Sequence, residues 1–147
     1  MRKKERGKQK EKGFTFFEIL VVVTIIGLLA ALVGPRLWGK ISGGKQTAAK
    51  AQIELFGTAL DAFRLDTGRY PTTEEGLKAL REQPSGVDNW NGPYLPKVIP
   101  LDPWKRPYIY RSPGEHGDYD IISYGADGVE GGEGENADIT SWKAVGQ

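Results

Sequence analysis

The sequence predicts an α+β fold in which one long N-terminal helix packs on a small antiparallel β-sheet. Residues 14–33 form an almost uninterrupted apolar run, and apolar side chains at helical spacing continue as far as residue 63. Two short segments, residues 108–111 and 119–124, alternate apolar or aromatic side chains with polar ones and have turn residues between them, as paired strands do. A chain of 147 residues is long enough for one domain of this kind.

The apolar run from Phe14 to Val33 predicts a transmembrane helix. Its only polar side chains are those of Thr15, Glu18 and Thr24. Such a run, at about 1.5 Å per residue, gives a helix of about 30 Å, which matches the hydrocarbon core of a bilayer. The alternatives are a buried core helix, which would need a larger protein around it, and an ordinary secretory signal, which would end in a small-x-small cleavage site. Gly34-Pro35 directly follows the run instead.

The charges beside the run predict its orientation. Seven of the first twelve residues are basic and two are acidic, whereas residues 34–147 are mildly acidic. A basic block can be an arm that binds nucleic acid, but beside an apolar run it more often sets membrane orientation. The basic block is therefore expected in the cytoplasm and residues 34–147 on the opposite side of the membrane.

Glu18 requires a partner inside the membrane. An acidic side chain in hydrocarbon costs about 2.5–3.5 kcal/mol on insertion scales unless it is neutralised. Cleavage between Gly13 and Phe14 would remove a basic leader, residues 1–13, and leave a positive α-amine on Phe14. The amine of one copy could then pair with Glu18 of a neighbouring copy, which predicts a homopolymer whose register this pair sets.

The segment from Lys12 to Glu18 resembles the prepilin cleavage motif of type IV pilins and related pseudopilins. The resemblance implies that a membrane-embedded prepilin peptidase cuts after Gly13, and that the same enzyme N-methylates the new terminal Phe14. The family usually has leucines where this chain has Phe16 and Phe17, and both residue types are apolar.

Gly34-Pro35 is expected to kink or locally unwind the helix, because proline lacks the amide donor and clashes with the preceding turn. This predicts two parts after the leader, namely a transmembrane and assembly helix over residues 14–35 and a globular domain over residues 36–147. The helix is expected to end near Thr67-Gly68. A single apolar stripe on it is expected to face the sheet: Ala48, Ala51, Leu55, Phe56, Ala59, Leu60 and Phe63.

Beyond the long helix, a capping box between Thr72 and Glu75 predicts the start of a second, short helix. The segments that follow resemble the major pseudopilins of type II secretion systems, and the similarity extends from Lys12 to Trp142. The segments that carry it are Asp66–Thr72, Gly76-Leu77, Asn91–Leu95, Asp102–Trp104 and Ser123–Gly128.

This resemblance implies a type IV pilin-like fold and a structural role. Members polymerise into a periplasmic pseudopilus that drives the export of folded proteins across the outer membrane. Implied partners are the prepilin peptidase, an inner-membrane assembly platform and minor pseudopilins. The implied location is the inner membrane, crossed once, with the C-terminal domain in the periplasm.

Residues 124–139 form a loop rich in carboxylates and glycines. On composition alone, a solvated acidic loop is the favoured interpretation, and the spacing is not that of an EF-hand. The resemblance implies instead a structural Ca²⁺ ion, held by the side chains of Asp127 and Asp138 and by the carbonyls of Tyr124 and Val129. Its expected role is stability and assembly.

Several features argue against an enzyme. The chain has no Cys and a single His, His116, which excludes thiol nucleophiles, disulfides and multi-histidine zinc centres. The tryptophans at 38, 90, 104 and 142 are expected to pack in the core or between subunits, because an acidic body repels nucleic-acid phosphates. The alternatives that remain are a type IV pilin or competence pseudopilin for adhesion, motility or DNA uptake, and a membrane-anchored binding or catalytic module.

Overall fold

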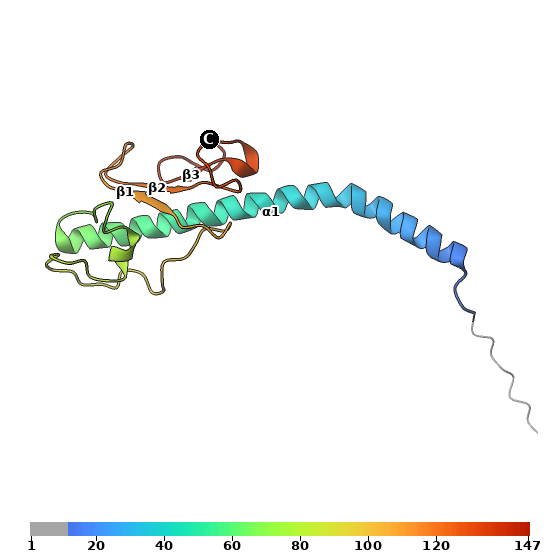
Figure 1. Cartoon of the computed structure of the whole chain (residues 1–147), viewed down its shortest axis with the longest axis horizontal. Coiled ribbons are helices and arrows are strands. Elements are labelled where there is room, and N and C mark those ends of the chain that lie inside the picture. Colours follow the sequence, from blue (N-terminus) through green and yellow to red (C-terminus); the bar gives the residue numbers. More distant parts are fainter. Residues whose placement is uncertain (1–11) are drawn as a thin grey trace, which may run out of the picture. The chain divides into compact units, whose positions relative to one another are not determined.

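The computed structural model describes residues 12–147, without the side chains of residues 37–39. The chain divides into two compact units, Met1–Gly39 and Lys40–Gln147, which are described separately. Figure 1 labels the elements, which are α1 (Phe16–Thr67), the 3₁₀ helix η1 (Leu77–Leu80), β1 (Ile109–Arg111), β2 (Asp120–Ser123), the 3₁₀ helix η2 (Gly134–Asn136) and β3 (Ile139–Thr140).

Helix α1 continues through Gly34 and Pro35, so it is not unwound at this point, and the other expected outcome, a kink, stays a prediction. Proline inside a helix removes one backbone donor and costs about 3 kcal/mol, which does not by itself end a helix of 52 residues. The predicted C-terminal end is confirmed. The last helical residue is Thr67, and Gly68 adopts φ 85° while its amide donates to the Arg64 carbonyl at 2.8 Å.

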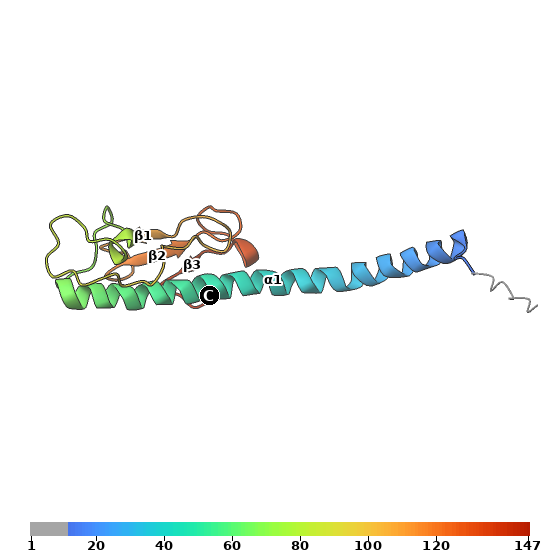
Figure 2. The same ribbon diagram turned by 90° about the horizontal axis from the view of Figure 1, so that it is seen from below.

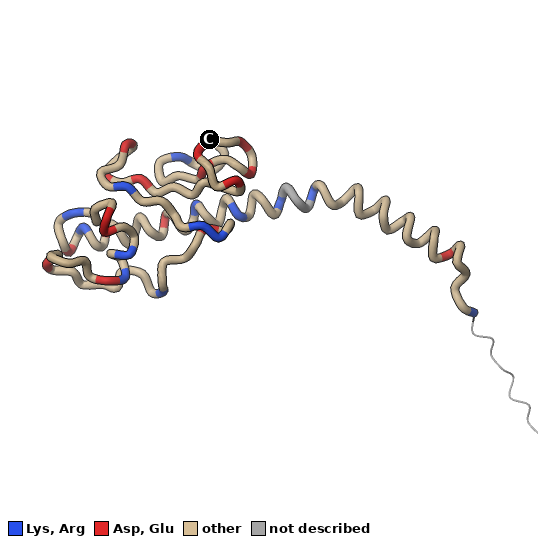
Figure 3. Tube along the Cα trace, in the orientation of Figure 1, with Lys and Arg blue, Asp and Glu red and all other residues tan. Residues whose placement is uncertain are grey.

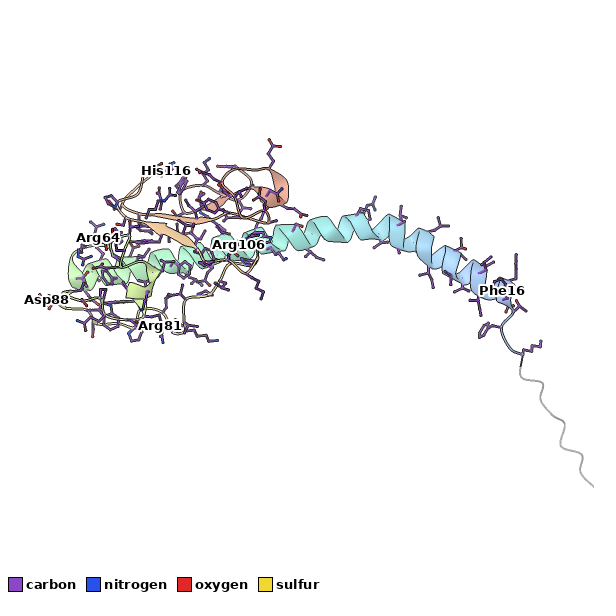
Figure 4. The ribbon with its side chains drawn as sticks, viewed as in Figure 1. Phe16, Arg64, Arg81, Asp88, Arg106 and His116 are labelled. Carbon is purple, nitrogen blue, oxygen red and sulfur yellow. The ribbon has the colours of Figure 1, made fainter. Side chains whose placement is uncertain are left out.

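Among the residues that the structure describes, the apolar side chains of the N-terminal unit are uncovered. None of the most apolar 18-residue window of α1 is buried, and every Phe, Leu, Ile and Val from Phe14 to Val33 is exposed. Figure 4 shows side chains projecting from this part of the helix, which begins at the labelled Phe16. The helix is long and apolar enough to cross a membrane.

In the second unit, the buried face of α1 differs from the predicted stripe. Phe56, Ala59, Leu60 and Phe63 are buried as expected, but Ala48, Ala51 and Leu55 are exposed, and Ala49 and Ile53 take their places. Positions 49, 53, 56, 60 and 63 are spaced by four and three residues, so they lie on one side of a 3.6-residue helix. Position 55 falls outside that line.

Aromatic side chains from the loops and strands complete this core. The Phe56 and Tyr108 rings meet edge-on with centroids 5.1 Å apart, and the buried Tyr110 hydroxyl donates to the Pro71 carbonyl at 2.8 Å. Burial raises the pKa of both Tyr108 and Tyr110 to about 12. The core also contains residues from η1, from the loop that follows it and from the sheet: Leu77, Ala79, Leu80, Val87, Ile121 and Ile139.

The sheet is antiparallel with the order β1-β2-β3. Tyr110 pairs with Ile121, and Ile122 pairs with Thr140. Figures 1 and 2 show the strands beside the C-terminal half of α1, which confirms the predicted α+β fold class. The two predicted strands are present, but β3 was not foreseen, because two residues are too few to produce an alternating pattern.

The predicted capping box forms at Thr72 and Glu75. The Glu75 amide donates to Thr72 Oγ1 at 3.2 Å, and the Thr72 amide donates to Glu75 Oε2 at 3.0 Å. The box leads into a turn followed by the short η1. Arg69 also donates to both Glu75 carboxylate oxygens at 2.8 Å, and these bonds are the main cause that lowers the pKa of Glu75.

Leu60 and Leu65 form a matched pair for testing the buried face of α1. Leu60 is fully buried, whereas Leu65 is 87% exposed. Leu60→Ala is expected to lower the free energy of unfolding by about 2–5 kcal/mol because it leaves a cavity, and Leu65→Ala by less than about 0.5 kcal/mol. Urea denaturation of the full chain in detergent, followed by circular dichroism, measures both. Equal losses would contradict this assignment of the core.

The Arg69–Glu75 pair predicts a pH-dependent contribution to stability. The folded pKa of Glu75 lies below its unfolded value, so the pair stabilises the protein above that unfolded value and stops doing so as the pH falls through the folded pKa. Glu75→Gln should cost about 1 kcal/mol at pH 7, and the difference from wild type should disappear as the pH falls through the folded pKa of Glu75. Denaturation at several pH values tests this. Glu82→Gln serves as the control, because the Lys78–Glu82 pair is largely exposed and should matter little at any pH.

Candidate functional site

Glu18 caps the N-terminus of its own helix. The Thr15 amide donates to Glu18 Oε2 at 3.1 Å, and the Glu18 amide donates to Thr15 Oγ1 at 3.2 Å. This reciprocal pair is a capping box, and the Thr-x-x-Glu spacing that identifies it is visible in the sequence, although the sequence analysis did not use it. Glu18 stays exposed, so a group from another molecule can reach it.

The predicted cleavage point lies just before the helix. Gly13, Phe14 and Thr15 are outside regular secondary structure and exposed, and the space beside Gly13 is open. Phe14 is 85% exposed. A peptidase needs an accessible, non-helical segment, and these residues provide one. Most of the basic leader, residues 1–11, lies outside the described residues.

The acidic loop that follows β2 is held closed by its own backbone. The loop has a first arm, residues 124–129, and a second arm, residues 134–139. The Ala126 amide donates to the Glu135 carbonyl at 3.0 Å, which joins the two arms. Gly125 has φ 68°, and a Cβ at this position would lie 2.7 Å from the Ala137 carbonyl oxygen. Only glycine allows the arms to approach so closely. Figure 3 shows several acidic residues in this region, near the C-terminus.

The two predicted side-chain ligands lie on opposite arms of the loop. Asp127 is exposed and its Oδ1 accepts from the Val129 amide at 3.2 Å. Asp138 Oδ2 accepts from the Gly131 amide at 2.9 Å, whereas its Oδ1 is buried and has no hydrogen-bond partner among the described residues. Tyr124 is half-buried and Val129 is 59% exposed.

One atom of the predicted ligand set, Asp138 Oδ1, suits a hard cation, while Tyr124, Asp127 and Val129 do not line the cavity beside it. A buried carboxylate oxygen without a donor is costly, and a cation would satisfy it. Asp138 also lines a cavity of about 440 Å³ together with Thr140, whose Oγ1 is likewise buried and without a partner in the described part of the chain. No three His, Cys, Asp or Glu side chains gather there or elsewhere in residues 12–147. A cation at this loop would therefore need backbone carbonyls besides the two carboxylates.

Contacts with α1 attach the loop to the body. Ser42 Oγ donates to Glu135 Oε1, and Gln46 Nε2 donates to the Gly134 carbonyl at 2.5 Å. Lys50 Nζ donates to the Thr140 carbonyl at 2.8 Å. The conformation of the loop is therefore coupled to the helix beneath it, a coupling that sequence patterns do not show because about ninety residues separate the partners.

His116 is used structurally. Its Nδ1 lies 3.0 Å from Oδ2 of the buried Asp120, and its ring stacks on Trp142 at a centroid distance of 3.8 Å. The pair ties the β1–β2 connection to the C-terminal segment. Trp90 Nε1 donates to the Ala79 carbonyl at 2.8 Å, in line with the expected packing role, while the Trp38 side chain lies outside the described residues.

Comparison with known families identifies the family of this chain. Residues 36–142 match the family model described as "Type II secretion system (T2SS), protein G", and residues 8–34 match the "Prokaryotic N-terminal methylation motif". The chain belongs to the type II secretion system protein G family. It is a pseudopilin, a structural subunit and not an enzyme.

Individual relatives agree with this assignment. The "Type II secretion system core protein G" of Pseudomonas aeruginosa is 45% identical over 92% of this chain and 97% of its own length, and that of Escherichia coli is 43% identical over 93% and 94%. The crystal structure of the major pseudopilin from the type 2 secretion system of enterohaemorrhagic Escherichia coli aligns with a TM-score of 0.63. It is 36% identical and covers 74% of this chain and 95% of that chain. These matches support the secretion-system pseudopilin and not the adhesive or DNA-uptake alternative.

Proposed function

We propose that this pseudopilin is inserted in the inner membrane, cut after Gly13, methylated on Phe14 and then polymerised into a periplasmic filament that drives folded proteins across the outer membrane. The observation that carries the proposal is the helix from Phe16 to Val33, whose apolar side chains are not covered by any part of residues 12–147. Lipid covers such a surface before assembly, and the helices of neighbouring subunits cover it afterwards.

The charges support a single topology. The basic leader remains in the cytoplasm and Lys40–Gln147 faces the periplasm. Assembly in this orientation requires a prepilin peptidase that also methylates, an inner-membrane platform that extracts subunits, and minor pseudopilins at the filament tip. No nucleic acid takes part.

Glu18 sets the register of the filament in this proposal. Its carboxylate is exposed and carries the only charge between Phe14 and Val33, and cleavage creates a positive amine four residues before it. A pair formed between the amine of one subunit and Glu18 of the next neutralises both charges in an apolar environment, where an unpaired charge is unfavourable.

Glu18→Gln and Glu18→Ala separate the two roles of this residue. Gln keeps an oxygen that can accept from the Thr15 amide but loses the charge, whereas Ala loses both. Both variants are expected to be processed normally and to lose assembly. Intact mass of protein from the native membrane measures processing, and cross-linking with electron microscopy measures filaments.

Wild-type protein should have the mass of residues 14–147 plus one methyl group. A full-length mass, or cleavage after Ala31, would overturn the proposed maturation. Filaments of normal yield from Glu18→Gln would show that the charge does not set the register.

We also infer that a structural Ca²⁺ ion occupies the acidic loop, held by Asp127 and Asp138 with the carbonyls of Tyr124 and Val129. The unpaired, buried Oδ1 of Asp138 supports the site, as does the closed glycine-rich backbone that brings the two arms together. The ion would order a loop that has few apolar contacts of its own, and so would stabilise the subunit for assembly.

Asp127→Asn tests the calcium site. Ca²⁺ at a hundredfold excess over Kd should raise the wild-type Tm by about 10 °C, because binding stabilises only the folded state. The variant should lose most of this rise. Glu130→Gln removes an exposed carboxylate of the same loop and is the control, with a response to Ca²⁺ like that of the wild type. A full Ca²⁺ response from Asp127→Asn would discard this ligand.

A further inference from the structure

Arg106 reaches from the segment before β1 to the first arm of the acidic loop. Its Nη1 donates to the Gly125 carbonyl at 3.0 Å and to the Ala126 carbonyl at 3.3 Å, and its Nη2 donates to the Ala126 carbonyl at 3.4 Å. Figure 4 labels Arg106. These carbonyls lie directly between Tyr124 and Asp127 in the chain.

The same guanidinium packs against the backbone on the other side of Asp127. A Cβ added at Gly128 would lie 2.6 Å from Arg106 Cζ and 2.6 Å from its Nε, so glycine at this position leaves the room that the side chain occupies. Arg106 therefore contacts the residues before and after Asp127. The arm it holds includes three of the four proposed ligands.

The backbone of Arg106 is hydrogen-bonded to Asp102, which in turn bonds the strand that leads into the loop. Its amide donates to Asp102 Oδ1 at 2.9 Å, and its carbonyl accepts from the Asp102 amide at 2.8 Å. Asp102 Oδ2 accepts from Ser123 Oγ at 2.8 Å, and both residues are buried. Ser123 ends β2 directly before Tyr124, so the guanidinium and the arm it contacts share one buried anchor.

We propose that Arg106 is a positioning residue that holds the arm from Tyr124 to Val129 in its cation-binding conformation before the cation arrives. This inference rests on the calcium site proposed above. Preorganisation reduces the ordering that binding would otherwise require, and partners of this kind outside the ligand set raise metal affinity. A like charge beside a cation site acts in the opposite direction, by repulsion.

Arg106→Lys separates these two effects, because Lys keeps the charge and loses the planar fork that bonds two carbonyls together. Its Kd for Ca²⁺, measured by isothermal titration calorimetry on the full chain in detergent with CaCl₂ alone, should be about tenfold weaker than that of the wild type. Lys105→Gln is the matched control. It removes a positive charge from the adjacent, exposed residue, and the Kd should change by less than about twofold, since exposed charges are well screened.

The thermal response distinguishes positioning from general stabilisation. At subsaturating Ca²⁺, the rise in Tm should be smaller for Arg106→Lys than for the wild type, because the ion and the guanidinium favour the same loop conformation. An equal loss of Tm in EGTA and in Ca²⁺, with an unchanged Kd, would overturn the proposal. So would an equal weakening of binding by Lys105→Gln.

Other outcomes are also decisive. If the wild-type protein does not bind Ca²⁺, both the calcium site and the role of Arg106 are overturned, whereas binding by the wild type with an unchanged Kd in Arg106→Lys overturns only the latter. If Arg106→Lys does not fold, Gly128→Ala disturbs the same arm, because its methyl group would displace the guanidinium and φ 70° is unfavourable for alanine, so retained binding is the informative outcome. Binding of wild-type strength by Gly128→Ala would then reject the proposal.

Discussion

Helix α1 has two different environments along its length, and the packing of the rest of the structure depends on this constraint. In the described part of the N-terminal unit its apolar side chains are exposed on all sides of the helix, which is long and apolar enough to cross a membrane. In the second unit only one face is apolar and buried, from Ala49 to Phe63. Residues of η1, of the sheet and of the loops, including aromatic side chains, pack against that face.

The body achieves this packing with little regular structure. Its strands are two to four residues long, and the described chain contains no cysteine that could cross-link it. Aromatic rings supply much of the buried area instead: Phe63 meets Tyr94 edge-on with centroids 5.8 Å apart, and Trp90 meets Tyr94 at 5.6 Å. Buried hydrogen bonds, such as that from Ser123 to Asp102, fix the loops between the elements.

The acidic loop cannot be ordered by apolar packing, because it has almost no apolar side chains to bury. Glycines in the left-handed region let its arms approach, and donors from α1 reach the Gly134 carbonyl and the Glu135 carboxylate of its second arm. Arg106 donates in the same way to two carbonyls of the first arm. In the described part of the chain these contacts leave Asp138 Oδ1 and the nearby Thr140 Oγ1 without a partner, and a cation would satisfy the carboxylate oxygen.

The sequence by itself determined the features that depend on neighbouring residues: the apolar run, the position of Glu18, the end of α1 at Thr67, and two of the three strands. Only the tertiary structure decided which side of α1 is buried: Ala49 and Ile53 are buried, and Ala48 and Ala51 are not. It alone showed β3, the contact of Arg106 with the acidic loop, and the continuous helix at Pro35. Most of these features depend on contacts between residues far apart in the chain, which local spacing and composition do not encode.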